Sequence, residues 1–262
     1  GAAGNLLKPD LIAPGQDILA AVSPVGYGGN TFDLLSGTSM SSPHIAGMAA
    51  LMKELHPNWS PMMIKSALMT TGYDVLDTNA DGTPISDAAR IFRQGAGHVR
   101  INAAANPGLV FDSNWNDWLA FLCGVQPGGG CTGVTPIHPS ELNVPSIAFG
   151  ALPGAQTVKR KVTNASGSPA TYTPSVSGMT GFLVEVAPMS LSLAAGETKE
   201  FSVTVTRTTA PLSFTVPVSD GVASFVVRAL IATVGAVVSI VNSLVVASVP
   251  MLPPTLPVTA TL

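Results

Sequence analysis

The sequence predicts a mixed α/β segment followed by an all-β sandwich, and three observations lead to this fold class. Residues 1–112 combine short extended segments with two strongly apolar helical segments. Between residues 140 and 228, short alternating segments are separated by Gly, Pro and Asn turns, a pattern typical of a β-sandwich. A mean hydropathy of +0.41 with only 10% charged residues is very apolar for a soluble chain. We therefore expect interior surfaces that need neighbours to cover them.

The elements of the first part follow from local signals. Residues 10–21 and 31–35 are predicted to be extended, with Gly and Pro turns around them. Apolar residues from Ile45 onwards predict a helix over 39–55 that is apolar on most faces and therefore buried. Ser60 is a good N-cap and Pro61 a good first helical residue, so a second helix is predicted over 62–71.

The stretch Gly-Thr-Ser-Met-Ser-Ser-Pro-His-Ile-Ala-Gly, residues 37–47, carries the chemistry. Gly37 permits a tight turn and leaves no side chain above the following serine. Ser39 then lies in the first helical turn, where unpaired N–H groups and the helix dipole stabilise negative charge. A nucleophile held on a rigid helix suits attack on a carbonyl. The nucleophile elbow of α/β-hydrolases does not fit, because Ser41 stands where that motif needs glycine; packing and capping alone are the other explanation.

These eleven residues resemble the serine motif of the subtilisin-like serine proteases, in which the serine of Gly-Thr-Ser-Met is the nucleophile. Residues 8–15 upstream, and 95–99, 107–112 and 142–147 downstream, are similar to the plant cucumisin-like branch. The resemblance implies that residues 1–112 are the C-terminal part of a parallel-sheet peptidase domain and that residues 140–228 are a fibronectin type III-like sandwich. It also implies a serine endopeptidase acting on proteins or peptides, with Ser39 as the catalytic residue.

The partners of Ser39 are absent from the part of the chain where the family has them. In subtilisin the order is Asp, His, Ser, yet the 38 residues before Ser39 contain no histidine. The acidic residues Asp10, Asp17 and Asp33 and the upstream asparagines lie in none of the family's contexts. The resemblance therefore implies that the acid, the base and the oxyanion asparagine belong to a missing N-terminal part, and that this chain alone is inactive. A non-catalytic remnant and a β-sandwich binding module are the alternatives.

None of the four histidines replaces the missing base. His44 follows Ser39 by five residues, which places it about 140° away around the helix, and it matches a structural histidine of the family. His56 lies at a helix end, His98 lies in a glycine-rich turn, and His138 lies in the Pro-rich linker within 113–139.

Cys123 and Cys131 flank a turn with three consecutive glycines, and this spacing suits a local disulfide. The resemblance supports the pairing, because the segment around Cys123 is similar to a cysteine segment of the plant branch. A disulfide implies an oxidising environment, so we expect a secreted, extracellular protein. Two unpaired thiols are the alternative.

No cofactor is predicted. Residues 77–82 match the opening of a calcium-binding loop, but Ala88 stands where a bidentate Glu is required, and such loops are also ordinary surface turns. The net charge of −3 argues against nucleic acid as a partner.

The last 34 residues, 229–262, contain no Lys, Arg, Asp, Glu or His. Residues 229–249 are long enough to span a membrane, but no basic residue follows them as an anchor. Many are Val, Ile or Thr, which also favour strands. We therefore expect strands or a loosely ordered tail rather than a membrane anchor.

Overall fold

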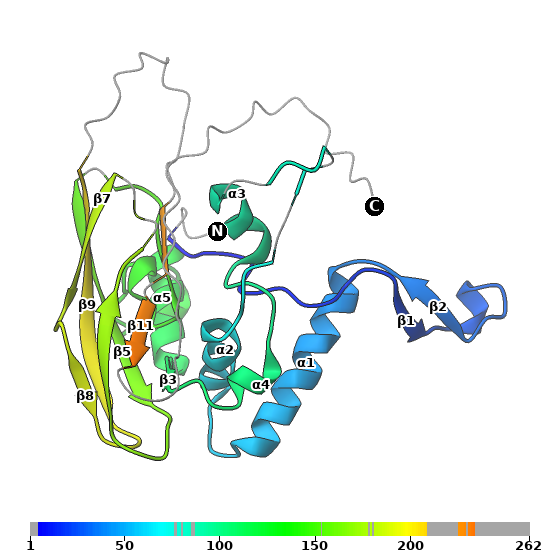
Figure 1. Cartoon of the computed structure of the whole chain (residues 1–262), viewed down its shortest axis with the longest axis horizontal. Coiled ribbons are helices and arrows are strands. Elements are labelled where there is room, and N and C mark those ends of the chain that lie inside the picture. The colour runs from blue at the N-terminus through cyan, green and yellow to red at the C-terminus, as the bar shows by residue number, and fades with distance from the viewer. Residues whose placement is uncertain are drawn as a thin grey trace, which may run out of the picture.

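The computed structural model describes residues 5–75, 78–79, 81–84, 87–152, 154–177, 179, 181–208, 225–228 and 230–233, the last two ranges by their backbone alone. Figure 1 shows a sandwich of strands on one side, helices beside it, and a hairpin projecting at the far end. The helices are α1 (Thr38–Leu55), α2 (Pro61–Thr70), α3 (Asp87–Gln94), α4 (Ile101–Ala104) and α5 (Trp115–Val125). The strands are β1 (Ile18–Ala21), β2 (Phe32–Leu35), β3 (Leu109–Val110), β4 (Ser146–Phe149), β5 (Ala155–Asn164), β6 (Ala170–Ser175), β7 (Phe182–Ala187), β8 (Leu191–Leu193), β9 (Thr198–Arg207), β10 (Phe225–Arg228) and β11 (Leu230–Thr233).

Helix α1 forms where the sequence predicts it, but the prediction that it is buried is wrong for this chain. Met52 is its one buried residue, whereas Leu51 and Leu55 are 57% and 56% exposed. One face of α1 contributes to an apolar cluster that also contains Ile64 and Leu68 of α2. No described element covers the opposite face, so the apolar side chains there meet solvent.

The β1–β2 hairpin is also apolar and exposed. Its strands pair antiparallel from Ile18↔Leu35 to Ala21↔Phe32. Leu19 and Leu34 face each other across the hairpin and are 68% and 60% exposed. In Figure 1 the hairpin extends away from the helices, beyond the start of α1.

Helix α2 is capped as the sequence predicts. The Ser60 hydroxyl accepts a hydrogen bond from the Met63 N–H at 3.0 Å, and Pro61 occupies the first turn. Six of its ten residues are buried, from Ile64 to Thr70. This helix is therefore the centre of the first part of the molecule, whereas α1 lies at its edge.

The segment that precedes β1 runs alongside residues 97–99. Ile12 and His98 form a parallel bridge, which is the one parallel pairing among the described residues. Gly97 has a φ of 106°, and a Cβ there would lie 2.3 Å from the Tyr73 carbonyl oxygen. Only glycine fits this crossing, which explains the glycines of the Gly-Ala-Gly-His turn.

The second part is an antiparallel β-sandwich. One sheet has the order β3-β5-β9-β7, and β11-β6-β8 and β10-β4 are the other described pairings. Inward residues of β5 and β9 alternate with polar outward residues, as the sequence predicts. The largest of the core side chains are Phe111, Phe149, Tyr172 and Phe201.

Strand β3 joins the two parts of the molecule. It pairs with the end of β5, so its sheet belongs to the sandwich. Val110 packs in the cluster of α1 and α2, whereas Leu109 and Phe111 on either side pack in the sandwich core. A short run of chain therefore contributes to both cores through alternate side chains.

Between β3 and β4, the structure contains helix α5 and the Cys123–Cys131 disulfide. Asn114 caps α5 in a capping box with Asp117. No helix among the described residues is both long and apolar enough to cross a bilayer. In the tail, residues 230–233 form β11, which pairs with β6, and the remainder of 229–262 lies outside the described residues.

Candidate active site

Ser39 is the second residue of α1 and its side chain is exposed. Gly37 precedes the helix with a φ of 150°, so the turn uses the conformational freedom of glycine. The Ser39 hydroxyl has no hydrogen-bond partner among the described residues. Its backbone N–H lies in the first turn, where no intrahelical acceptor exists and the dipole is positive. The position therefore combines an accessible nucleophile with donors for an oxyanion.

Two hydrogen bonds hold the start of α1 against the preceding chain. The Gly37 N–H donates to the Gly15 carbonyl at 2.7 Å, and the Ser41 hydroxyl donates to the Ala13 carbonyl at 3.0 Å. A Cβ at Gly15 would lie 2.8 Å from the Gly37 oxygen, so the two segments are in close contact. Residues 13–15, Ala-Pro-Gly, thus help to hold the serine turn. The sequence of residues 8–15 resembles the family, but it does not by itself predict this contact.

All four histidines have structural hydrogen bonds and none is bonded to Ser39. The His44 Nδ1–H donates to the Met40 carbonyl at 2.8 Å, one turn back along α1. His56 bonds to the Ala105 carbonyl and His98 to the Val99 carbonyl, both at 2.9 Å. His138 bonds to the Ser140 hydroxyl at 2.7 Å. His56 also stacks on Trp59, with ring centroids 3.7 Å apart. The chain therefore places no histidine where it could accept the serine proton.

A cavity of about 620 Å³ lies between α1, α2 and residues 9–12. Its lining is mainly apolar and includes Thr38 but not Ser39. Lys65 and Asp10 form an ion pair there at 2.9 Å. Burial lowers the pKa of Lys65, and the Asp10 charge opposes that effect. Because the amine and the carboxylate neutralise each other, this cavity offers no ready general base.

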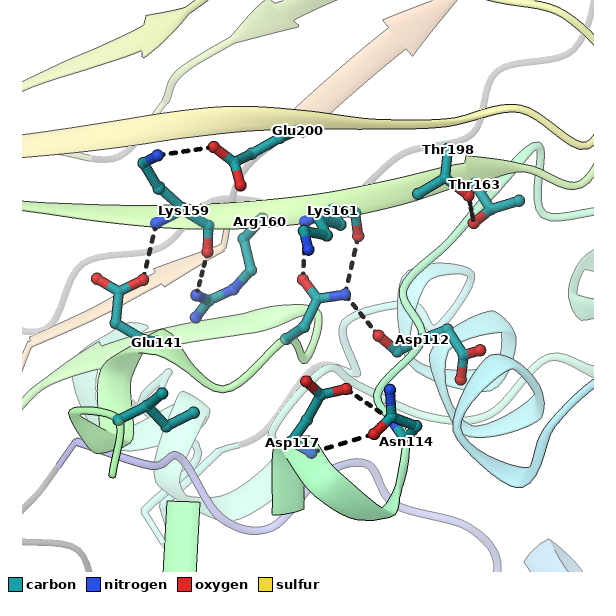
Figure 2. Close-up of a pocket in the computed structure, with 12 residues that line it drawn as sticks. Asp112, Asn114, Asp117, Glu141, Lys159, Arg160, Lys161, Thr163, Thr198 and Glu200 are labelled. Carbon is teal, nitrogen blue, oxygen red and sulfur yellow. Dashed lines mark hydrogen bonds and ion pairs between the residues drawn. The ribbon is translucent and has the colours of Figure 1, made fainter. Parts of the chain in front are cut away.

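A second cavity, of about 490 Å³, lies between the start of α5 and strands β5 and β9 (Figure 2). Its carboxylates already have partners. Glu200 pairs with the Lys159 amine at 2.9 Å, and Glu141 accepts the Lys159 N–H at 3.1 Å. Asp117 accepts the Asn114 N–H at 2.7 Å in the capping box. The described residues contain no group of three or more ligands that could hold a metal ion. This pocket is therefore built from structural contacts.

The calcium-like loop is held by its own side chains where it is described. Asp81 Oδ1 accepts hydrogen bonds from both the N–H and the hydroxyl of Thr83, and Asn79 donates to the same hydroxyl. These hydrogen bonds lower the pKa of Asp81. Asp77 and the side chain of Ala88 lie outside the described residues.

Comparison with known proteins matches two families to separate segments of the chain. The subtilase family matches residues 2–97, and a fibronectin type III domain family matches residues 141–232. Among similar proteins of Arabidopsis thaliana, subtilisin-like protease SBT2.5 is 44% identical over 227 residues, which cover 77% of this chain and 28% of the relative. Subtilisin-like protease SBT1.7 is 41% identical over 229 residues, with 77% and 30% covered. The chain thus spans less than a third of the length of these relatives.

Both matches coincide with the two parts of the structure. The first contains the Gly-Thr-Ser-Met turn and α1, and the second contains the sandwich from just before β4 to within β11. The predicted fold class is confirmed, as is the resemblance read from residues 37–47. Residues 2–97 are therefore a segment of the subtilase family, to which a fibronectin type III domain is joined at residues 141–232.

Proposed function

We propose that this chain is the serine-bearing part of a serine endopeptidase in which Ser39 attacks the peptide carbonyl. The observation that carries the proposal is the exposed Ser39 in the first turn of α1, inside the segment that matches the subtilase family. Protein and peptide substrates follow from this chemistry.

The reaction proceeds by acyl transfer. The Ser39 Oγ bonds to the carbonyl carbon while its proton passes to a general base, and the N–H groups of the first turn stabilise the oxyanion. The amine then leaves with a proton, and water hydrolyses the acyl-enzyme. Because all four histidines have structural partners, the base must come from outside these 262 residues, together with the orienting acid and the oxyanion asparagine. The remainder of the peptidase domain is thus the partner that this chain needs.

The Cys123–Cys131 disulfide supports a secreted, extracellular protein, since such bonds persist in oxidising compartments. The chemistry needs no cofactor. We accordingly expect a calcium chelator to leave peptidase activity unchanged, which a hydrolysis assay with and without EGTA would check.

An organophosphonate probe tests the nucleophile directly. In the full-length protein, the probe should label Ser39, and Ser39→Ala should abolish both labelling and hydrolysis. His44→Ala serves as the matched control, because His44 bonds to Met40 and not to the nucleophile. Labelling of another serine, as identified by peptide mass mapping, would refute the assignment.

The 262-residue chain by itself should show no measurable hydrolysis of a peptide substrate. In subtilisin, loss of the catalytic serine or histidine lowers turnover by about 10⁶-fold, and the described geometry supplies no histidine to Ser39. A continuous fluorogenic assay with the Ser39→Ala chain as the blank measures this. Turnover that depends on Ser39 would contradict the proposed need for outside residues.

A further inference from the structure

Asp17 and Ser36 form a side-chain clamp at the base of the β1–β2 hairpin. The Asp17 N–H donates to the Ser36 hydroxyl at 2.8 Å, and that hydroxyl donates to Asp17 Oδ1 at 3.2 Å. Ser36 directly precedes Gly37 and lies three residues before Ser39. The clamp is therefore located where the chain enters the serine turn.

Asp17 has an unusual backbone conformation. Its φ of 51° is the one positive value at a non-glycine position among the described residues. Side chains disfavour this left-handed region, although Asp tolerates it better than most. Such conformations persist where several contacts enforce them, and they cluster at functional sites. Here the enforcing contact is Ser36, which also borders the serine turn.

Within the turn, main-chain hydrogen bonds rather than side-chain contacts hold Gly37. Gly37 has no side chain and lacks a side-chain cap bond, and both Thr38 and Ser39 are exposed. A glycine at this position gives the backbone freedom to rotate. The position of Ser39 therefore depends on the contacts that flank Gly37.

The clamp lies just outside the hairpin ladder, on the side of α1. The four residue pairs of the ladder lie between Ile18 and Leu35, and the clamp is the next contact outside them. Leu19 and Leu34, on the outer face of the hairpin, are mostly exposed to solvent and do not pack over the clamp. The Asp17–Ser36 contact instead adds to the Gly37–Gly15 bond, so the two together fix the entry to α1.

We propose that Asp17 and Ser36 are positioning residues that hold Gly37, and through it the Ser39 Oγ, in the geometry of attack. The proposal rests on the proposed peptidase function. Neither residue touches the reacting atoms or binds substrate, so loss of the clamp should lower kcat and leave KM nearly unchanged. A displacement of about 1 Å at a nucleophile lowers the rate by up to about 10²-fold.

Kinetics of the full-length enzyme on a chromogenic peptide test the clamp. Ser36→Ala removes both clamp bonds and should lower kcat about tenfold while KM stays within about twofold. Ser36→Thr keeps the hydroxyl and should restore most of the loss. Ser23→Ala, at the other end of the hairpin where the serine makes no cap bond, should leave both constants unchanged. Wild-type kcat in Ser36→Ala would overturn the proposal.

Asp17→Gly separates positioning from folding. Glycine adopts a φ of 51° without strain, which offsets the greater freedom of its unfolded chain and the lost carboxylate bond, so the melting temperature should change little while kcat falls severalfold. An unchanged kcat, or a joint fall of kcat and melting temperature, would show that the clamp does not position the serine. The Ser39→Ala enzyme distinguishes the two proposals: if it still hydrolyses the peptide, the peptidase assignment fails, whereas if it is inactive and the clamp variants are normal, only the clamp fails.

Discussion

At the scale of single residues, Arg160 is a charged side chain buried in the sandwich. It is 2% exposed, and its guanidinium donates to the carbonyls of Val144, Lys159, Ser140 and Ser146. Burial lowers its pKa to about 10, and the charge of Glu141 partly opposes this. Backbone carbonyls thus compensate for removing the charge from water. These contacts connect β5 to the chain that enters β4.

Arg160→Met should lower the free energy of unfolding by about 2–3 kcal/mol, because four carbonyls, three of them in buried hydrogen bonds, lose their donor at once. Lys161→Met is the matched control on the next residue of β5, whose side chain is exposed, and should change stability by less than about 0.5 kcal/mol. Urea denaturation followed by circular dichroism measures both. If Arg160→Met were as stable as the wild type, the cost of burying the charge would fully offset the contribution of its hydrogen bonds.

At the scale of elements, the start of α2 shows how one residue serves two structures. The Ser60 hydroxyl accepts from the Met63 N–H and also donates to Asp112, which follows β3. The cap therefore ties the central helix of the first part to the chain that follows β3 of the sandwich sheet. Ser60→Ala should cost about 1–2 kcal/mol, whereas Ser60→Thr keeps the oxygen and should cost less. Thermal melting compares the two, and equal melting temperatures would contradict a capping role.

The Cys123–Cys131 disulfide stabilises the end of α5. Cys123 is buried in the helix, and Cys131 follows a glycine-rich turn that is flexible when unfolded. Replacing both cysteines by serine should lower the free energy of unfolding by about 2–3 kcal/mol on the loop-entropy estimate. Urea titrations with and without reductant provide the measurement, since reductant should destabilise the wild type but not the double variant. Free alkylation of both thiols in secreted protein would show that the bond does not form.

At the scale of the whole molecule, β3, which precedes the sandwich in the chain, forms one strand of a sandwich sheet. Leu109 and Phe111 are 2% and 3% exposed in its core, so a fragment that begins at residue 140 loses both. We expect fragment 107–233 to melt at a higher temperature than fragment 140–233, since burying each side chain contributes about 1.5–3 kcal/mol. Circular dichroism melts decide this. Equal melting temperatures would mean that β3 is dispensable to the sandwich.

Fragment 1–112, by contrast, should not fold stably on its own. Its α1 and β1–β2 hairpin expose Leu19, Leu34, Leu51 and Leu55, which is the apolar surface that drives aggregation. We expect aggregation in size-exclusion chromatography, with fragment 107–233 as the soluble control. A soluble 1–112 fragment with a cooperative melt would show that it is a complete small domain.

Much of this protein follows from local sequence alone. The spacing of apolar residues predicted α1, the Ser-Pro pair predicted the start of α2, and alternation predicted the strands of the sandwich, because each depends on neighbours within a few residues. The Gly-Thr-Ser-Met turn likewise predicts Ser39 as the nucleophile. These signals depend on residues close in sequence, so they can be interpreted without knowledge of the rest of the fold.

Tertiary structure decided what local patterns do not encode. Whether the outer face of α1, with Leu51 and Leu55, is covered depends on elements distant in sequence, and these two side chains are more than half exposed. The Asp17–Ser36 contact spans 19 residues, and the link from Ser60 to Asp112 spans 52. The sequence could thus indicate a candidate nucleophile and its helix, while only the folded chain showed which distant groups hold that helix in place, because contacts between distant residues depend on how the whole chain packs.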